Sequence, residues 1–319
     1  MSKRKVALLS ATLVAVAGIG FAAANFRGKD DKILRVANQK GQVKAMMLAS
    51  GVLKGAPYSV EWSEFPAAQP LLEAVGGGAA DLGLAADAPF IFAYQSGSPV
   101  KAIAVQAPAA QAAEALAILV KKGSPIRSAA DLAGRSVATT RGSIGHHLLL
   151  QALERAQIPV DKVRVTFLTP GDAKAAFDSG AIDAWATWTP YTNVAIKEGA
   201  RTVADAKDYG LPLYIDIAHA DSIEPKRALM ADFLQREARA VAWARTHPGE
   251  FSQVLAKETG LPLDIARASF DRNNRVSQPI DGKVIAHEQE ITDRFRKAGL
   301  IAGNRDVAQA FDTSFGKRE

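Results

Sequence analysis

Short apolar segments alternate with segments of helical periodicity from residue 33 to residue 188, and this alternation constrains the fold more than any other feature. The apolar segments predicted as strands are ILRVAN (33–38), YSVEWSEF (58–65), ADLGLAA (80–86), VKAIAVQA (100–107), ALAILVK (115–121), RSVATT (135–140), VRVTFLT (163–169) and AIDAWATW (181–188). Strand–helix–strand alternation is typical of a mainly parallel sheet with helices on both faces. Because the pattern completes one cycle and starts a second, it predicts two α/β domains.

The end of the chain has a different pattern. Residues 224–315 show almost wholly helical periodicity, so we expect terminal helices that pack back on the first domain. A chain of 319 residues, 48% hydrophobic and 23% charged, is long enough for two separate cores. It contains no cysteine, which excludes disulfides, thiol catalysis, thiolate metal sites and a lipid anchor on a processed cysteine.

The first 24 residues have the order of an export signal: MSKRK is basic, VALLSATLVAVAGIGF is apolar, and residues 22–24 form a small-residue cleavage site. An uncleaved membrane anchor is disfavoured, because the apolar run is shorter than the ~20 residues of a spanning helix. Cleavage near Ala24 removes three basic residues and leaves 36 basic and 33 acidic ones, a formal charge of +3. Since the basic residues are interleaved with acidic ones, we expect no nucleic-acid partner.

Ligands of open α/β sheets bind beyond the carboxyl ends of the strands. Residues 38–41, 87–89, 141–143 and 188–190 follow four of the predicted strands. In the third group, a helix N-terminus supplies unpaired N–H groups, Gly142 permits close approach, and Arg141 adds a charge with planar donors. The pattern predicts an anion site. The alternative is that Ser143 caps the helix, Gly142 turns the chain and Arg141 is a solvated charge.

Two other strand-end residues have two interpretations each. Asp87, with Pro89 close behind it, fits a helix N-cap better than a ligand contact, so we expect backbone N–H groups to occupy its oxygens. Trp188 fits either ordinary packing or a flat wall against an organic ligand. Trp185 points to the opposite face of the strand and is assigned to packing.

The sequence lacks the motifs of catalysis and metal binding. The segment around Ser143 does not have the G-x-S-x-G spacing of a nucleophile elbow, and no triad order is evident. The five histidines show no H-E-x-x-H or comparable spacing, and a phosphate-binding loop is absent. We therefore predict no catalytic residue, no metal site and no cofactor.

Seven segments together resemble solute-binding proteins of ABC importers in the aliphatic sulfonate, taurine and nitrate group, with the greatest likeness to alkanesulfonate-binding proteins. The segments are QKG (39–41), EWSEFPAAQPLLEAVGGGAADLG (61–83), ADAPFIFA (86–93), KKGSPIRSAADLAGRSVA (121–138), TTRGSIGHHLLLQALE (139–154), AAFDSGAIDAWATWTPY (175–191) and RVSQPID (275–281). They extend over nearly the whole chain after residue 24.

The resemblance implies an α/β type II periplasmic-binding-protein fold, in which two α/β lobes enclose a cleft and two crossing strands form the hinge. Lobe I would comprise residues 33–115 and 220–319, and lobe II residues 116–219 including the hinge strands. The crossing segments would lie near 115–121 and 213–219, with His219 close to the cleft.

The resemblance also implies a function and a set of ligand-facing residues. These residues are Gln39, Gly41, Asp87, Ala88, Arg141, Gly142, Ser143, His146 and Trp188. Arg141 stands where related sequences often carry asparagine or another residue. The implied function is periplasmic capture of a small organic anion, an aliphatic sulfonate before taurine, a sulfate ester or nitrate. A monomer would deliver it to an ABC permease in the membrane. An enzyme of the thiamine-precursor synthase type, or a hydrolase, is the alternative of another class.

We predict that the exported protein begins near Asn25. The basic, apolar and small-residue order of residues 1–24 is the reason, because signal peptidase recognises that order. Intact-mass measurement of material recovered outside the cytoplasmic membrane checks the prediction, and a mass that retains residues 1–24 would contradict it.

Overall fold

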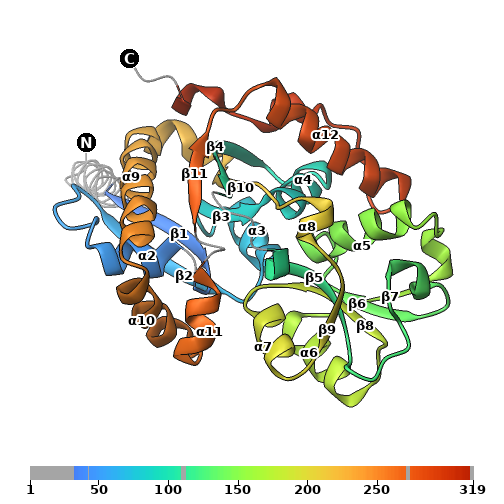
Figure 1. Cartoon of the computed structure of the whole chain (residues 1–319). Helices are drawn as coiled ribbons and strands as arrows, with labels where there is room; N and C mark the ends of the chain where they lie inside the picture. The colour runs from blue at the N-terminus through green and yellow to red at the C-terminus, as the bar shows by residue number, and fades with distance from the viewer. Residues whose placement is uncertain (1–31, 42, 109–112, 271–273, 317–319) are drawn as a thin grey trace, which may run out of the picture.

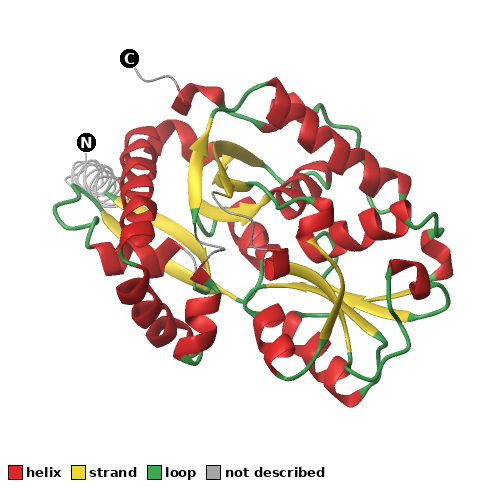
Figure 2. Ribbon diagram, viewed as in Figure 1, coloured by secondary structure: helices red, strands yellow, loops and turns green. Residues whose placement is uncertain are grey.

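The computed structural model describes residues 32–41, 43–108, 113–270 and 274–316, and it contains two lobes that are each built on one sheet (Figures 1 and 2). The prediction of two α/β lobes is confirmed. The predicted signal peptide lies outside the described residues.

The first sheet has six strands in the order β11-β4-β10-β3-β1-β2. They are β1 (Ile33–Gln39), β2 (Ser59–Phe65), β3 (Leu82–Ala86), β4 (Val100–Pro108), β10 (Tyr214–His219) and β11 (Arg275–Gln278). β1 is parallel to β2 and β3, and Val36 lies opposite both Trp62 and Leu82. β10 is antiparallel to β3 and β4, and β11 is antiparallel to β4.

The second sheet has five strands in the order β7-β6-β8-β5-β9. They are β5 (Leu116–Val120), β6 (Ser136–Thr139), β7 (Arg164–Phe167), β8 (Ala184–Trp188) and β9 (Arg201–Asp205). β6 is parallel to β7 and β8, whereas β5 is antiparallel to β8 and β9.

Both sheets are mixed but mainly parallel, as predicted, because four of the described strands in each sheet run in one direction and only β5, β10 and β11 run against them. β5 and β10 enter their sheets directly from the other lobe. The terminal region is almost wholly helical, as predicted, except that residues 275–278 form the edge strand β11. A strand of four residues is too short for its alternating pattern to be recognised among segments of helical periodicity.

Eleven helices of the described residues cover the two sheets. They are α2 (Val43–Ser50), α3 (Ala68–Gly76), α4 (Asp87–Gln95), α5 (Ile144–Arg155), α6 (Pro170–Ser179), α7 (Tyr191–Lys197), α8 (Ala206–Tyr209), α9 (Ala220–Thr246), α10 (Pro248–Thr259), α11 (Leu263–Ala268) and α12 (Gly282–Lys297). α2, α9 and α10 pack on one face of the first sheet, while α3 and α4 pack on the other. α5 covers the inner face of the second sheet, and α6 and α7 cover its outer face.

Side-chain alternation on the strands divides the interior into three clusters. On β8, Trp188 belongs to the cluster between the lobes and Trp185 to the outer cluster, where it contacts Phe177. The assignment of Trp185 to packing is therefore confirmed. α12 contacts both α4 and α5, so it is held by both lobes (Figure 1). Its Phe295 is buried in the inter-lobe cluster, and its Arg294 pairs with Glu154 of α5 at 3.0 Å.

The chain passes from the first sheet to the second after β4 and returns after β9. Residues 214–219 were assigned to lobe II from the sequence, but β10 lies between β3 and β4 in the first sheet. His219 does not lie at the cleft, since β10 is antiparallel and ends beside the amino end of β4, opposite Val100. The other lobe bounds and the hinge motion stay predictions.

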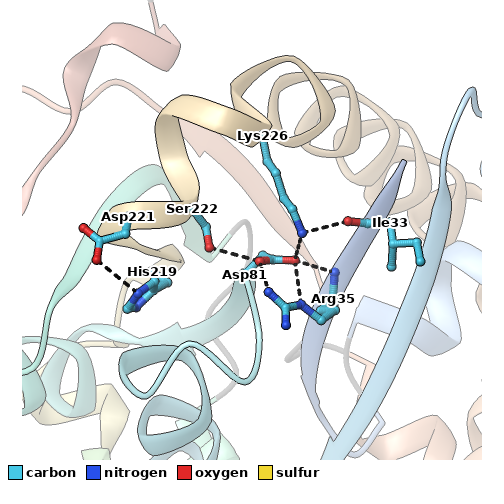
Figure 3. Close-up of polar contacts among 7 residues, drawn as sticks. All are labelled: Ile33, Arg35, Asp81, His219, Asp221, Ser222 and Lys226. Atoms are coloured by element: carbon cyan, nitrogen blue, oxygen red, sulfur yellow. Dashed lines mark hydrogen bonds and ion pairs between the residues drawn. The ribbon is translucent and has the colours of Figure 1, made fainter. Parts of the chain in front are cut away.

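An ion-pair network at the amino ends of β1 and β3 joins the first sheet to α9 (Figure 3). The side chain of Asp81 is fully buried, and it accepts hydrogen bonds from Arg35 at 2.9 Å and from Lys226 at 2.7 Å. The Ser222 hydroxyl also donates to this carboxylate, at 3.0 Å. Lys226 reaches the network because Pro225 breaks the helical geometry of α9, leaving Lys226 at φ −118°.

Burial of the Asp81 carboxyl opposes its ionisation, but the bonds from Arg35 and Lys226 outweigh burial and lower its pKa to about 2. A depressed pKa means that the ionised network stabilises the fold fully above the ordinary Asp pKa. The stabilisation is then lost as the pH falls from about 4 through about 2.

We predict that Asp81→Asn lowers the free energy of unfolding by about 3 kcal/mol at pH 7, because it leaves the partly buried Lys226 without its counter-ion. Ser222→Ala is the matched control and should cost about 1 kcal/mol, the value of one hydrogen bond. Urea unfolding at pH 7 and at pH 3 measures both. Equal losses for the two variants at pH 7 would show that the ion pairs contribute nothing beyond the hydrogen bonds.

Candidate functional site

Three helix N-termini meet in a narrow cleft between the lobes. The cleft is lined by the first residues and N-cap positions of α3, α4 and α5, with Gln39 at the end of β1 and Trp188 at the end of β8. Among the described residues of this lining, Arg141 is the only charged side chain. Because each helix N-terminus carries a partial positive charge, the cleft is electropositive.

The N-termini differ in how they are capped. Ala67 and Ala86 hold the N-cap positions of α3 and α4, and neither can cap through a side chain. In α5 the Ser143 hydroxyl accepts from the N–H of His146 at 3.1 Å. The alternative interpretation of Ser143 as a helix cap is therefore confirmed. The N–H groups of Ile144 and Gly145, in the first turn of α5, have no partner among the described residues.

Gly142 takes part in a tight contact between the lobes. Its φ is +70°, a left-handed conformation that favours glycine. A β-carbon at this position would lie 2.7 Å from the ring of Phe92 in α4. The Gly142 N–H donates to Nδ1 of His146 at 3.2 Å, and the Ser143 N–H donates to the carbonyl of Thr140 at 3.1 Å. Both groups are therefore already bonded within the protein.

Arg141 lies between aromatic rings of the two lobes. Its guanidinium carbon is 6.0 Å from the ring centroid of Phe92 and 5.2 Å from that of Phe167, at the end of β7. These are cation–π distances, which hold the side chain while leaving its N–H donors available. No carboxylate of the described residues forms an ion pair with Arg141. Its positive charge is therefore not neutralised at the cleft.

His146 lies behind this contact. Its ring is buried and packs edge-on against Phe167 and Phe295, with centroids 4.9 and 5.5 Å away. Burial, together with the positive charge of Arg141, lowers the pKa of His146 to about 3. The imidazole is therefore neutral at physiological pH, and its Nδ1 accepts from Gly142, which supports the loop rather than the cleft lining.

Asp87 is the first residue of α4 rather than its N-cap, so the N-cap prediction is wrong. Backbone N–H groups do occupy its oxygens, as predicted: Oδ1 accepts from Ala88 at 2.6 Å and Oδ2 from Leu213 at 2.7 Å. Oδ2 also lies 3.0 Å from Nε2 of His287, and this hydrogen bond raises the pKa of His287. The carboxylate thus faces the segment before β10 and α12.

One buried donor of the cleft lacks a partner. Trp188 is 4% exposed, and its indole Nε1–H has no acceptor among the described residues. A buried donor without a partner costs free energy, so this N–H is a candidate for a bond to a ligand. Gln39, which is 7% exposed and carries a side-chain amide, lines the same cleft.

The structure brings together part of the predicted site. Gln39, Arg141, Ser143 and Trp188 line the cleft, and Gly142 lines an adjoining cavity. The predicted site residues outside the lining are Gly41, Asp87, Ala88 and His146. Gly41 faces α10, where a β-carbon would lie 2.7 Å from Thr259.

Sequence reasoning missed the N-terminus of α3. Ala67, Ala68 and Gln69 line the cleft and directly follow β2. The strand-end rule would have found them had it been applied to the second strand as well. Among the described residues, no group of three His, Cys, Asp or Glu side chains could hold a metal ion. No described helix combines the length and apolar composition of a membrane span.

Comparisons with known proteins place these features in context. The family model described as NMT1/THI5 like matches residues 59–251. The periplasmic aliphatic sulphonate binding protein SsuA from Escherichia coli has 33% sequence identity and a TM-score of 0.77, over 88% of this chain and 91% of that one. The alkanesulfonate-binding protein SsuA from Xanthomonas axonopodis pv. citri, bound to MOPS, has 27% identity and a TM-score of 0.79, over 88% and 98%.

Two further proteins show how far the likeness extends. The taurine-binding periplasmic protein of Escherichia coli strain K12 is 27% identical over 152 residues, which are 48% of this chain and 46% of that protein. The desulfurization enzyme DSZB has the same fold at 17% identity and a TM-score of 0.66, over 89% of this chain and 97% of that one. The predicted periplasmic-binding-protein fold is confirmed, and this fold also occurs in an enzyme.

We predict that Gly142→Ala destabilises the protein more than Gly134→Ala. Both glycines are left-handed, at φ +70° and +76°, so both alanines cost about 1–2 kcal/mol in backbone strain. Only at Gly142 would the added methyl group clash with a ring, and moving the Phe92 ring should cost about 1 kcal/mol more. Gly134 has open space around its β-carbon position. Urea unfolding measures the difference. Equal losses would show that the Phe92 ring gives way without cost.

Proposed function

Because the chain belongs to the NMT1/THI5-like family, we propose that it captures a small organic anion, an aliphatic sulfonate, in the periplasm and delivers it to an ABC import permease. The observation that carries the proposal is the cleft itself. Three helix N-termini, one unneutralised arginine and the unpaired indole N–H of Trp188 face a space whose lining, among the described residues, contains no carboxylate. We propose that the protein does this as a monomer.

A sulfonate fits these groups for physical reasons. It stays ionised at ordinary pH and offers three acceptor oxygens, so it can use several donors at once. The donors proposed here are the Arg141 guanidinium, Trp188 Nε1–H, the Gln39 amide and the N–H groups at the start of α5. The N–H groups of Gly142, Ser143 and Ala88 are bonded within the protein and are not part of the proposal.

The size of the cleft supports a hinge motion. Its free volume is about 20 Å³, which holds about one water molecule and not a sulfonate head. Ligand entry therefore requires the lobes to separate about the segments before β5 and β10, and bonds to the anion would favour their return. The lobe bounds and the hinge strands predicted from the sequence belong to this proposal.

Binding without turnover is the second part of the proposal. The Ser143 hydroxyl accepts from the N–H of His146, and Nδ1 of His146 accepts from the N–H of Gly142, so neither group is arranged as a nucleophile and its base. The alternative is an enzyme, since the fold also occurs in a desulfurization enzyme. Mass spectrometry of the ligand after incubation separates the two, because a binding protein returns it unchanged.

Taurine, a sulfate ester and nitrate remain the alternative ligands. Taurine carries an ammonium group, and the strand-end carboxylate of Asp87 already bonds to Leu213 and His287. Nitrate could use the same donors but has no organic group for the apolar part of the lining.

We predict that alkanesulfonates raise the melting temperature at matched ionic strength more than taurine, nitrate or sulfate do. A ligand at 100 times its dissociation constant stabilises the folded state by about 2.7 kcal/mol. Arg141→Ala should weaken every anion by about 1–3 kcal/mol, and Trp188→Phe by about 1 kcal/mol, because each loses a hydrogen-bond donor. Arg127→Ala, an exposed arginine outside the cleft, is the control.

Isothermal titration of each variant measures these changes. Stabilisation by nitrate or taurine alone would contradict the sulfonate assignment. Unchanged affinity in Arg141→Ala would contradict the role of the arginine, and unchanged affinity in Trp188→Phe would contradict that of the indole N–H.

A further inference from the structure

A second cavity opens beside the cleft, between α3, α4 and the loop that follows β6. Its volume is about 440 Å³, within the range of ~300–1,000 Å³ that is typical of small-molecule pockets. Gln69, Pro89 and Arg141 line both spaces, so the two adjoin at these residues. We call this cavity the outer chamber.

The walls of the outer chamber are mainly apolar. α3 contributes Leu72, and α4 contributes Phe92 and Ala93, one turn beyond Pro89. These residues recur at intervals of three and four, so one face of each helix lines the space. On these faces Phe92 and Ala93 are half-buried, and Leu72 is buried.

The positive and the negative side chain of the outer chamber lie at different places in it. Two charged side chains line it among the residues that the structure describes: Arg141, at the neck shared with the cleft, and Glu73, which belongs to α3. Glu73 accepts from Gln69 within α3 at 3.1 Å and forms no ion pair among the described residues. A ligand with a single anionic head at the neck and an uncharged body in the chamber matches this arrangement, whereas a second anionic group would meet Glu73.

We infer that the outer chamber holds the organic tail of the sulfonate, so that the protein selects monoanionic sulfonates with a bulky apolar or aromatic tail. The inference rests on the proposed function, because the head group in the cleft brings the tail to the neck. In this arrangement Trp188 donates a hydrogen bond to the sulfonate head and does not contact the tail, because its ring lines only the cleft and its Nε1–H is unpaired. The tail extends from the cleft into the outer chamber, past Arg141 and along α4.

The size of the chamber sets the expected selectivity. Each methylene buried against its walls should tighten binding about three- to fourfold, the equivalent of ~0.8 kcal/mol. Affinity should rise from methanesulfonate through hexanesulfonate, and an aromatic sulfonate such as naphthalenesulfonate should still fit. A short ligand such as methanesulfonate does not reach into the chamber, which then stays filled with water.

The experiment compares two variants that each add one aromatic ring on a helix. Ala93→Phe fills the outer chamber from α4, and Ala238→Phe places the same ring on an exposed position of α9. Titration calorimetry gives the ratio of the dissociation constants of methanesulfonate and hexanesulfonate for each protein. The wild type and Ala238→Phe should keep a ratio well above tenfold, and in Ala93→Phe the ratio should fall towards one. Circular dichroism and melting temperature verify that each variant is folded.

Glu73→Gln provides an independent variant with no change of volume. It should improve binding of a sulfonate with a distal carboxylate by several-fold and leave the tail-length series unchanged. Glu61→Gln, on the exposed side of β2, should change neither measurement. A wild type that binds methanesulfonate and hexanesulfonate equally would overturn the inference and leave the proposed function standing. The same holds for a ratio that Ala93→Phe does not change. Failure of every sulfonate to bind would overturn both.

Discussion

The reciprocal bonding of Asp87 and Leu213 is the interaction on which the arrangement of the site depends. The Asp87 N–H donates to the carbonyl of Leu213 at 3.0 Å, and the Leu213 N–H donates to the Asp87 carboxylate at 2.7 Å. These bonds hold the returning chain against the start of α4 just before it becomes β10. β10 then fills the centre of the first sheet between β3 and β4, so the second lobe is tied to the edge where β1 and β3 end.

The electrostatics of the cleft follow from that geometry. The Asp87 carboxylate, at the start of α4, faces Leu213 and His287, and the described lining of the cleft is left with Arg141 as its only charge. His146 adds none, because burial and the adjacent arginine keep its imidazole neutral. The partial positive charges of the three helix N-termini then all act on a ligand that binds between them. An anion with several acceptors gains most from such a set of donors.

Packing between the lobes limits how that ligand can be held. Phe295 of α12 lies in the inter-lobe cluster, and Gly142 rests against Phe92. A hinge that opens the cleft must therefore part an aromatic contact and restore it on closure. The same contact leaves the half-buried ring of Phe92 facing the outer chamber, where it can meet the body of a ligand. Stability and specificity thus depend on one loop, residues 141–143.

The sequence by itself determined the strands β1–β8, the two α/β lobes and the position of the candidate site at strand ends, because hydrophobic periodicity and helix-start residues are local signals. Gln39, Arg141, Ser143 and Trp188 follow from that rule. Only the tertiary structure decided that Asp87 turns to Leu213, that β10 runs antiparallel in the first sheet, and that His219 lies at its far end. It also decided that Gly41 faces α10 and that residues 67–69 join the cleft. These outcomes depend on which distant segments pack together, and a local sequence pattern does not identify the distant segment that it packs against.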